Sequence, residues 1–283
     1  MKATEDVLTV PGARLYYKVR GSGPLLLLLQ GGGGDADASE GIASRLLEQF
    51  TVVTYDRRGL SRSRLDEGTD APSSLETHSD DVHRLLAALS TEPVFLVGHS
   101  IGAVIGLDLV ARHPEQVRVL VAHEPPATQL LPDEERTYAE HAQKEVEETY
   151  HRDGATAAVK KMGALVRADA RNREPGVKMP APTSQTAANL AFFLTHDEPA
   201  TRRHRLDIAA LEAAPTRIVF VGGRDSRGVW TRRSAEELAK RLGAEFLEFP
   251  GDHNGFTFHP RAFATGLREI LSGSAAGAGE QPR

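Results

Sequence analysis

The feature that most constrains the fold is an alternation of buried apolar runs and helical segments that begins at Pro24. The runs PLLLLL, FTVVTYD, PVFLVG and VRVLVAH are short and mostly apolar, which is typical of strands buried on both faces. Helical segments such as SEGIASRLLEQF and SLETHSDDVHRLLAALS separate them. Strands joined in this way form right-handed crossovers, so the sequence predicts an α/β fold with a doubly wound, mostly parallel sheet.

The alternation is interrupted once, after Pro125-Pro126, where residues 127–211 show helical patterns only. Strand character returns at TRIVFVGG and again at AEFLEF. Between these two runs, Ser234 and Glu237 fit a capping box that would open the helix SAEELAKRL. The tail SGSAAGAGEQPR is small and polar, which favours disorder. We therefore expect a core of residues 1–126 and 212–271, an inserted helical cap of residues 127–211 and a disordered tail of residues 272–283.

Composition excludes several classes of function. The net charge of −5 over 283 residues argues against nucleic acid or an anionic membrane as the main partner. The chain has no cysteine, so a thiol nucleophile, a disulfide and a thiolate metal site are excluded. The N-terminus carries early acidic residues and no long apolar run, so we expect a cytoplasmic protein that acts on a small molecule. The oligomeric state stays open.

A glycine-rich loop, QGGGGDA, follows the first central apolar run. Gly31, Gly33 and Ala36 fit the dinucleotide-binding pattern G-x-G-x-x-G/A, and Asp56 ends the next strand twenty residues later, where a ribose-binding acid is expected. The pattern therefore raises the hypothesis of a nucleotide-binding oxidoreductase. Against it, strand-like segments (DVLTV and ARLYYKV) precede the loop, whereas this fingerprint usually opens its fold.

A second motif lies at residues 98–102, GHSIG, between a buried strand and a helix. In this setting G-x-S-x-G places Ser100 on a sharp turn with its hydroxyl exposed, and the N–H of Ile101 can face a developing oxyanion. The competing interpretation is a serine N-cap with incidental glycines. A serine nucleophile needs a base, and His253 in the late loop PGDHNGF is the candidate.

The remaining histidines fit this role less well. We expect His99 to point away from the nucleophile, and the histidines of the insertion to be solvated: His141, His151, His196 and His204.

The motifs GHSIG, the turn after YDRRG and the late GDHNG together resemble the α/β-hydrolase family over residues 7–271, with the insertion as its cap. The resemblance implies a metal-free, cofactor-free serine esterase or lactonase with Ser100 as nucleophile and His253 as base. It also implies a second oxyanion donor in the glycine loop, which by position is the N–H of Gly32. Gln30 stands where the family often has histidine. A serine nucleophile excludes relatives that use aspartate, such as haloalkane dehalogenases.

Two residues compete for the acid that orients the histidine. Asp225, in FVGGRDS, lies at the family's usual place, but an alternative register puts Ser226 there and leaves no acid. Glu124 directly follows the strand after the nucleophile helix, where some members, zearalenone-type lactonases among them, place their acid. We favour Glu124, because a glutamate between a buried strand and two prolines is unusual without a role; Asp225 stays the alternative.

The sequence indicates the substrate and the reaction only in general terms. NLAFFL and the segment 162–166 could wall an apolar pocket, which suits a hydrophobic ester or lactone. A cofactor-free perhydrolase or haloperoxidase could use the same residues, and a non-catalytic receptor on this fold is a further alternative. We expect Asp56, Arg57 and Arg58 to hold loops rather than to act on substrate.

Overall fold

The computed structural model, which describes residues 3–71, 74–178, 181 and 183–273, is built around one central sheet. Within the described residues, nine strands run in the order β1-β2-β4-β3-β6-β7-β8-β9, with β5 paired to β2. Pairs that involve β1, β2 or β5 are antiparallel, and all others are parallel. The predicted mostly parallel α/β sheet is therefore confirmed. The strands are β1 (Thr4–Val10), β2 (Ala13–Gly21), β3 (Leu25–Leu29), β4 (Thr51–Tyr55), β5 (Arg64–Leu65), β6 (Val94–His99), β7 (Val117–His123), β8 (Arg217–Gly223) and β9 (Glu245–Phe249).

The leucine run forms the middle of the sheet because both of its faces are covered. Leu27 and Leu29 pack into one core cluster, whereas Leu26 and Leu28 pack into the cluster on the opposite face. Side chains alternate between faces along a strand, so a strand buried on both sides must be apolar at every position. Each of these four leucines is at most 1% exposed.

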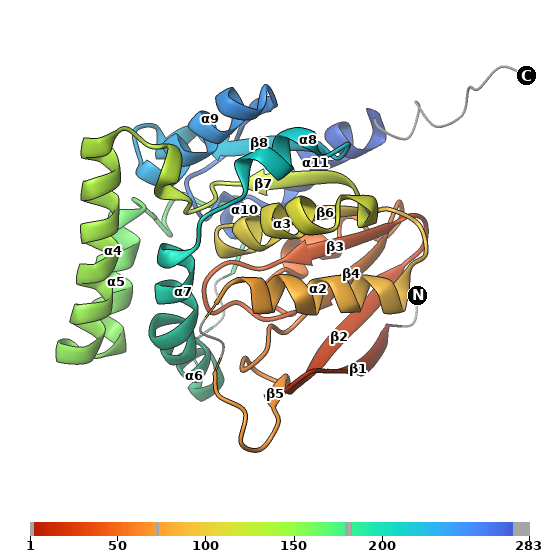
Figure 1. Cartoon of the computed structure of the whole chain (residues 1–283), viewed down its shortest axis with the longest axis horizontal. Helices are drawn as coiled ribbons and strands as arrows, with labels where there is room; N and C mark the ends of the chain where they lie inside the picture. The colour runs from red at the N-terminus through yellow and green to blue at the C-terminus, as the bar shows by residue number, and fades with distance from the viewer. Residues whose placement is uncertain (1–2, 72–73, 179–180, 182, 274–283) are drawn as a thin grey trace, which may run out of the picture.

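Helices cover both faces of the sheet (Figure 1). One face packs against α2 (Glu76–Leu89), α3 (Ile101–Arg112), α8 (Ile208–Ala213) and α9 (Trp230–Leu242). The opposite face packs against α1 (Glu40–Ala43), α10 (Gly255–Phe258) and α11 (Pro260–Gly273). Among the described residues, none of the helices combines the length and apolarity needed to cross a bilayer.

The segment between β7 and β8 is helical and lies to one side of the sheet, at the left of Figure 1. It contains η2 (Thr128–Leu130), α4 (Asp133–Asp153), α5 (Ala155–Leu165), α6 (Ser184–Phe192), a π-helical turn η3 (Phe193–Asp197) and α7 (Glu198–Arg203). A short turn, η1 (Pro114–Gln116), precedes β7, and η4 (Arg224–Ser226) follows β8.

Three local predictions differ from the structure. Helix α1 is only four residues long, far shorter than the predicted SEGIASRLLEQF. Helix α9 begins at Trp230, so Ser234 lies inside it and caps nothing; its buried hydroxyl donates instead to the carbonyl of Ala127. Helix α11 extends to Gly273, past the predicted start of the tail at residue 272, and residues 274–283 lie outside the described part of the chain.

Candidate active site

The turn between β6 and α3 holds Ser100 in an unusual backbone conformation, with φ 54° and ψ −123°. A positive φ strains a residue with a side chain and is typical of functional turns. The flanking glycines make the turn possible. A Cβ on Gly98 would lie 2.5 Å from the carbonyl oxygen of Gly102, and one on Gly102 would lie 2.3 Å from that of Leu29. Strand and helix therefore approach so closely that only glycine fits at both positions.

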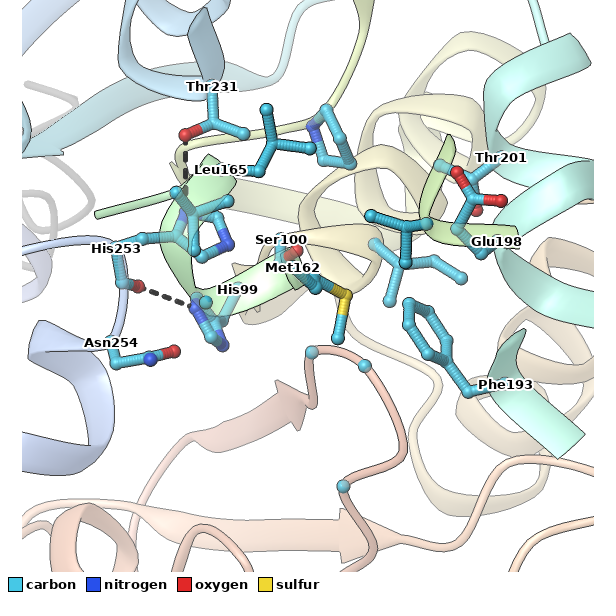
Figure 2. Close-up of a pocket in the computed structure, with 18 of the residues that line it drawn as sticks. His99, Ser100, Met162, Leu165, Phe193, Glu198, Thr201, Thr231, His253 and Asn254 are labelled. Carbon is cyan, nitrogen blue, oxygen red and sulfur yellow. Dashed lines mark hydrogen bonds between the residues drawn. The ribbon is translucent and has the colours of Figure 1, made fainter. Parts of the chain in front are cut away.

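His253 and Glu124 lie in direct contact. His253 follows β9, and its Nδ1 is 2.8 Å from Oε2 of the fully buried Glu124. The histidine loop is held by Asp252, whose carboxylate accepts the N–H of Asn254 at 2.8 Å and that of Asp169, from the segment after α5, at 2.7 Å. Ser100 and His253 line the same cavity (Figure 2). The structure thus brings Ser100, His253 and Glu124 to one site.

The carboxylate of Glu124 is surrounded by donors. Oε1 accepts the N–H of Gly223 at 2.9 Å and the hydroxyl of Ser226, and Oε2 accepts the hydroxyl of Thr231 at 2.9 Å. Burial alone raises the pKa of Glu124, but the hydrogen bond and charge of His253 outweigh it and hold this pKa well below its usual range. Glu124 is therefore ionised at neutral pH. Its backbone is strained as well, with φ 44°.

Asp225, the alternative acid, lies elsewhere. It is exposed in η4, and its Oδ2 accepts a hydrogen bond from the side-chain amide of Asn172 at 2.7 Å. The next residue, Ser226, is the one that turns inward and donates to Glu124. Ser226 and Thr231 were not predicted as site residues, because nothing local in the sequence shows that their hydroxyls meet a carboxylate about a hundred positions away.

Arg57 holds the glycine loop in place by hydrogen bonds to two of its carbonyl groups. Its Nη1 donates to the carbonyl of Gln30 at 2.9 Å, and its Nη2 donates to the carbonyl of Gly32. The same guanidinium forms a buried ion pair with Asp197 of η3 at 3.0 Å, and Asp197 also contacts Nε2 of His78 at 3.1 Å. Arg57 therefore ties the loop to the helical insertion, which agrees with the loop-holding role predicted for it.

Gly32 and Ile101, the two predicted oxyanion donors, both line the cavity beside Ser100. Gly32 has a φ of 41°, and a Cβ there would meet nothing within 4 Å. The amide nitrogen Nε2 of Gln30 is buried and makes no hydrogen bond within the described residues.

The dinucleotide interpretation of this loop is not supported by Asp56. Its buried carboxylate accepts hydrogen bonds from the N–H of Ala36 at 2.8 Å and from Arg62, through Nε at 2.7 Å and Nη2 at 2.8 Å. These bonds occupy both oxygens, so Asp56 is not available to a ribose. Arg58 forms a separate buried ion pair with Asp81 at 2.5 Å. As expected, these residues hold loops together.

The cavity has a volume of about 320 Å³ and lies between the sheet and the helical insertion. Figure 2 shows Met162, Leu165 and Phe193 of the insertion facing Ser100, with His253 to one side and Glu198 to the other. The expected apolar wall is present in part: Phe193 and residues 162, 163, 165 and 166 line the cavity. Asn189 from NLAFFL instead binds Ser61, accepting its N–H at 2.9 Å and donating to its hydroxyl at 2.8 Å.

His99 does not point away from the site as predicted. It lines the cavity, and its Nε2 is 2.8 Å from the carbonyl oxygen of His253. A carbonyl can only accept, so Nε2 carries the proton. Burial, followed by the charges of His253 and His123, lowers the pKa of His99 well below its usual value and keeps the ring neutral. The missing side chain of Gly31 makes room for it, since a Cβ there would lie 2.6 Å from Nδ1 of His99.

His204 is likewise not solvated. Its side chain is 4% exposed and lies between two carboxylates, with Nδ1 3.1 Å from Glu76 and Nε2 3.3 Å from Asp108. These three groups lie within 4.8 Å of one another and could together ligate a cation. They are not among the residues that line the cavity.

Comparisons with known proteins agree with this architecture. The sequence model of the alpha/beta hydrolase fold family matches residues 24–260. A Bacillus subtilis protein named Uncharacterized hydrolase YraK is 39% identical over 275 residues, which cover 96% of this chain and 97% of that protein. A Putative carbamate hydrolase RutD of Azorhizobium caulinodans is 37% identical over 108 residues, 38% of this chain and 40% of that protein.

Solved structures show the same fold. A carboxylesterase structure from the thaumarchaeon Nitrososphaera gargenis superposes with a TM-score of 0.75 at 18% identity, covering 96% of this chain and 100% of the other. At this identity the likeness shows the fold alone, whereas the family match extends over most of the sequence. The chain therefore belongs to the α/β-hydrolase fold family.

Proposed function

We propose that this α/β hydrolase is a serine hydrolase that cleaves a carboxylic ester or a lactone through an acyl-enzyme. The observation that carries the proposal is the contact of His253 Nδ1 with the buried carboxylate of Glu124 at 2.8 Å, at the edge of the cavity that contains Ser100. A strained serine, a histidine and a buried acid in one site are the parts that activate a hydroxyl nucleophile.

The protonation states follow from the hydrogen bonds. An ionised Glu124 can only accept, so Nδ1 of His253 carries the proton and Nε2 is left as the basic nitrogen. Nε2 takes the proton of Ser100 as the serine oxygen attacks the substrate carbonyl. The resulting imidazolium then gives this proton to the leaving alcohol. In the second half, His253 removes a proton from water, the hydroxide attacks the acyl carbon, and Ser100 regains its proton as the acid leaves.

The oxyanion formed in each step needs fixed donors. We assign them to the N–H of Ile101, at the start of α3, and to the N–H of Gly32. Arg57 supports the second donor, because it donates to the carbonyls of Gln30 and of Gly32 itself. Backbone donors held in this way do not have to reorganise as charge develops.

The cavity favours a substrate with a substantial apolar part. Its wall on the side of the insertion contains Val146, Met162, Leu165 and Phe193. Apolar walls with a few polar groups are typical of pockets that bind small organic molecules.

The proposal is tested with a fluorophosphonate, which reacts with an activated serine and leaves a stable adduct. Intact-protein mass spectrometry should show one adduct per chain in the wild type, and peptide mapping should place it on Ser100. The Ser100→Ala variant should stay unlabelled, whereas a Ser61→Ala control should label normally, because Ser61 binds Asn189 outside the proposed mechanism. An unlabelled wild type would refute the proposed nucleophile.

A further inference from the structure

The wall of the cavity formed by the insertion contains a buried carboxyl group that the proposed mechanism does not use. Glu198, the first residue of α7, is 9% exposed and lines the same cavity as Ser100. Its Oε2 is buried and has no hydrogen-bond partner within the described residues. Its Oε1 lies 3.9 Å from Nε of Arg202, which is too far for a hydrogen bond.

The neighbouring side chains do not form a hydrogen bond with this carboxyl group. Arg202 directs its Nη2 to Glu147 of α4 at 2.5 Å, and its Nε, which has no hydrogen-bond partner among the described residues, stays 3.9 Å from Oε1 of Glu198. The hydroxyl of Thr201 donates to the carbonyl of Asp197 at 2.7 Å. Both side chains are thus held by other groups of the protein, and Oε2 of Glu198 is left as an unused acceptor in a residue that lines the cavity.

The local backbone explains why Glu198 faces the cavity. The turn before it, η3, is π-helical, and the N–H of Glu198 bonds to the carbonyl of Phe193, five residues earlier. In a regular α-helix, residues five apart lie on different faces, whereas the wider π-turn brings them toward the same one. Phe193 and Glu198 accordingly both line the cavity, while Asp197 between them turns to Arg57. Single π-turns of this kind occur frequently at functional sites.

Burial without a partner is unfavourable for a charged group. It raises the pKa of Glu198 to about 7, an effect that Glu147 reinforces and that Arg202 and Arg203 oppose. Buried polar groups are nearly always hydrogen-bonded in folded proteins, so an unsatisfied one at a ligand cavity indicates a partner supplied by the ligand.

We propose that Glu198 is a specificity-determining residue that accepts a hydrogen bond from a hydroxyl or amide N–H group of the substrate. This inference rests on the proposed ester hydrolysis and adds a substrate class to it. Figure 2 shows Glu198 and Thr201 across the cavity from His253, with Ser100 and Met162 between them in this view. The preferred substrate then has its ester group at Ser100, an apolar stem along the Met162 and Phe193 side chains, and one donor at its far end.

The proposal is tested with matched pairs of esters that differ only at the far end. One pair varies the acyl part: p-nitrophenyl hexanoate and the p-nitrophenyl ester of adipic acid monoamide. The other varies the alcohol: hexyl acetate and 6-hydroxyhexyl acetate. The wild type should prefer the donor-bearing member of at least one pair in kcat/KM.

Three variants identify the group responsible. Glu198→Leu should lose this preference by about tenfold, the order of magnitude that a hydrogen bond to a charged group contributes, and should keep or raise kcat/KM for the plain ester. Glu198→Gln, whose amide oxygen can still accept, should retain most of the preference. Glu148→Gln, on the exposed side of α4, should behave as the wild type. Equal preference in the wild type and Glu198→Leu overturns the proposal.

A binding measurement separates this inference from the proposed chemistry. Trp230 is the sole tryptophan of the chain and lines the cavity, so its fluorescence reports on ligands there. In Ser100→Ala, the donor-bearing ester should bind about tenfold more tightly than its plain partner, and adding Glu198→Leu should abolish the difference. Selective binding without hydrolysis by the wild type would refute the proposed function alone, whereas hydrolysis without selectivity would refute this inference alone.

Discussion

Replacing Glu124 by glutamine tests the identity of the acid, because it keeps the shape of the side chain and removes its charge. In the structure the carboxylate accepts four hydrogen bonds, from Gly223, Ser226, Thr231 and His253. Glutamine has an NH2 group in place of one carboxylate oxygen, so this donor must face at least one of the four donors that now bind Glu124. If it opposes His253, the imidazole must turn or take the wrong tautomer, and its basic nitrogen no longer faces Ser100.

The expected loss in kcat is about 10⁴-fold, the size found when the acid of a serine protease triad is replaced by its amide. That factor corresponds to about 5 kcal/mol of transition-state stabilisation. One opposed buried donor should also lower the free energy of unfolding by about 1–3 kcal/mol. Urea denaturation measures the loss of stability separately from the loss of kcat. When it shows that the variant is folded, unfolding does not explain the lost activity.

The assay is steady-state hydrolysis of a p-nitrophenyl ester, with Asp225→Asn as the matched control. Asp225 is exposed and contacts Asn172, so its variant should keep kcat within about threefold. Glu124 is not the acid if Glu124→Gln keeps near-normal kcat while Asp225→Asn loses several orders of magnitude in kcat.

Three further changes have calculable outcomes. Gly102→Ala places a Cβ 2.3 Å from the carbonyl oxygen of Leu29 and should lower the free energy of unfolding, measured in urea, by about 1–3 kcal/mol. A Cβ on Gly163 in α5 meets nothing within 4 Å, so Gly163→Ala should leave the free energy of unfolding unchanged or raise it. Equal effects of the two variants would contradict the close approach of strand and helix at Gly102. Arg57→Lys cannot hold the glycine loop by two parallel bonds and should lower kcat about tenfold or more with a smaller change in KM; an unchanged kcat would show that the brace is not needed for catalysis. Burial raises the pKa of Glu198 to about 7, so the native state holds this proton more tightly than the unfolded chain, and the stabilising effect of the proton is complete below about pH 4.5 and is lost as pH rises through 7. Glu198→Gln should therefore raise the free energy of unfolding by up to about 3 kcal/mol at pH 8 and by little at pH 5. An equal effect at both pH values would contradict this.

The sheet could be predicted because its signal is local. A strand covered on both faces must be apolar throughout, and the run 25–29 shows this directly. The serine turn was also predictable, since two glycines around a serine between a strand and a helix describe its geometry within five residues. Predictions of this kind need no knowledge of distant parts of the chain.

Features that depend on distant residues were missed or wrong. Ser234 fits a local capping box, but a carbonyl 107 positions away binds its hydroxyl in the folded chain. His204 lies in a polar stretch, and only the fold places it between Glu76 and Asp108. The hydroxyl partners of Glu124 and the π-turn before Glu198 are likewise consequences of tertiary packing, which composition and periodicity do not encode.

Trapping the acyl-enzyme is the direct test of Ser100 as the nucleophile. The enzyme is mixed with excess p-nitrophenyl ester, quenched in acid within the first turnovers and digested for mass spectrometry. We expect the peptide with Ser100 to gain the mass of the acyl group, and we expect this adduct to be absent in Ser100→Ala and to decay with time in neutral buffer. Ester hydrolysis that proceeds at full rate in Ser100→Ala, or an acyl group found on another residue, would contradict it.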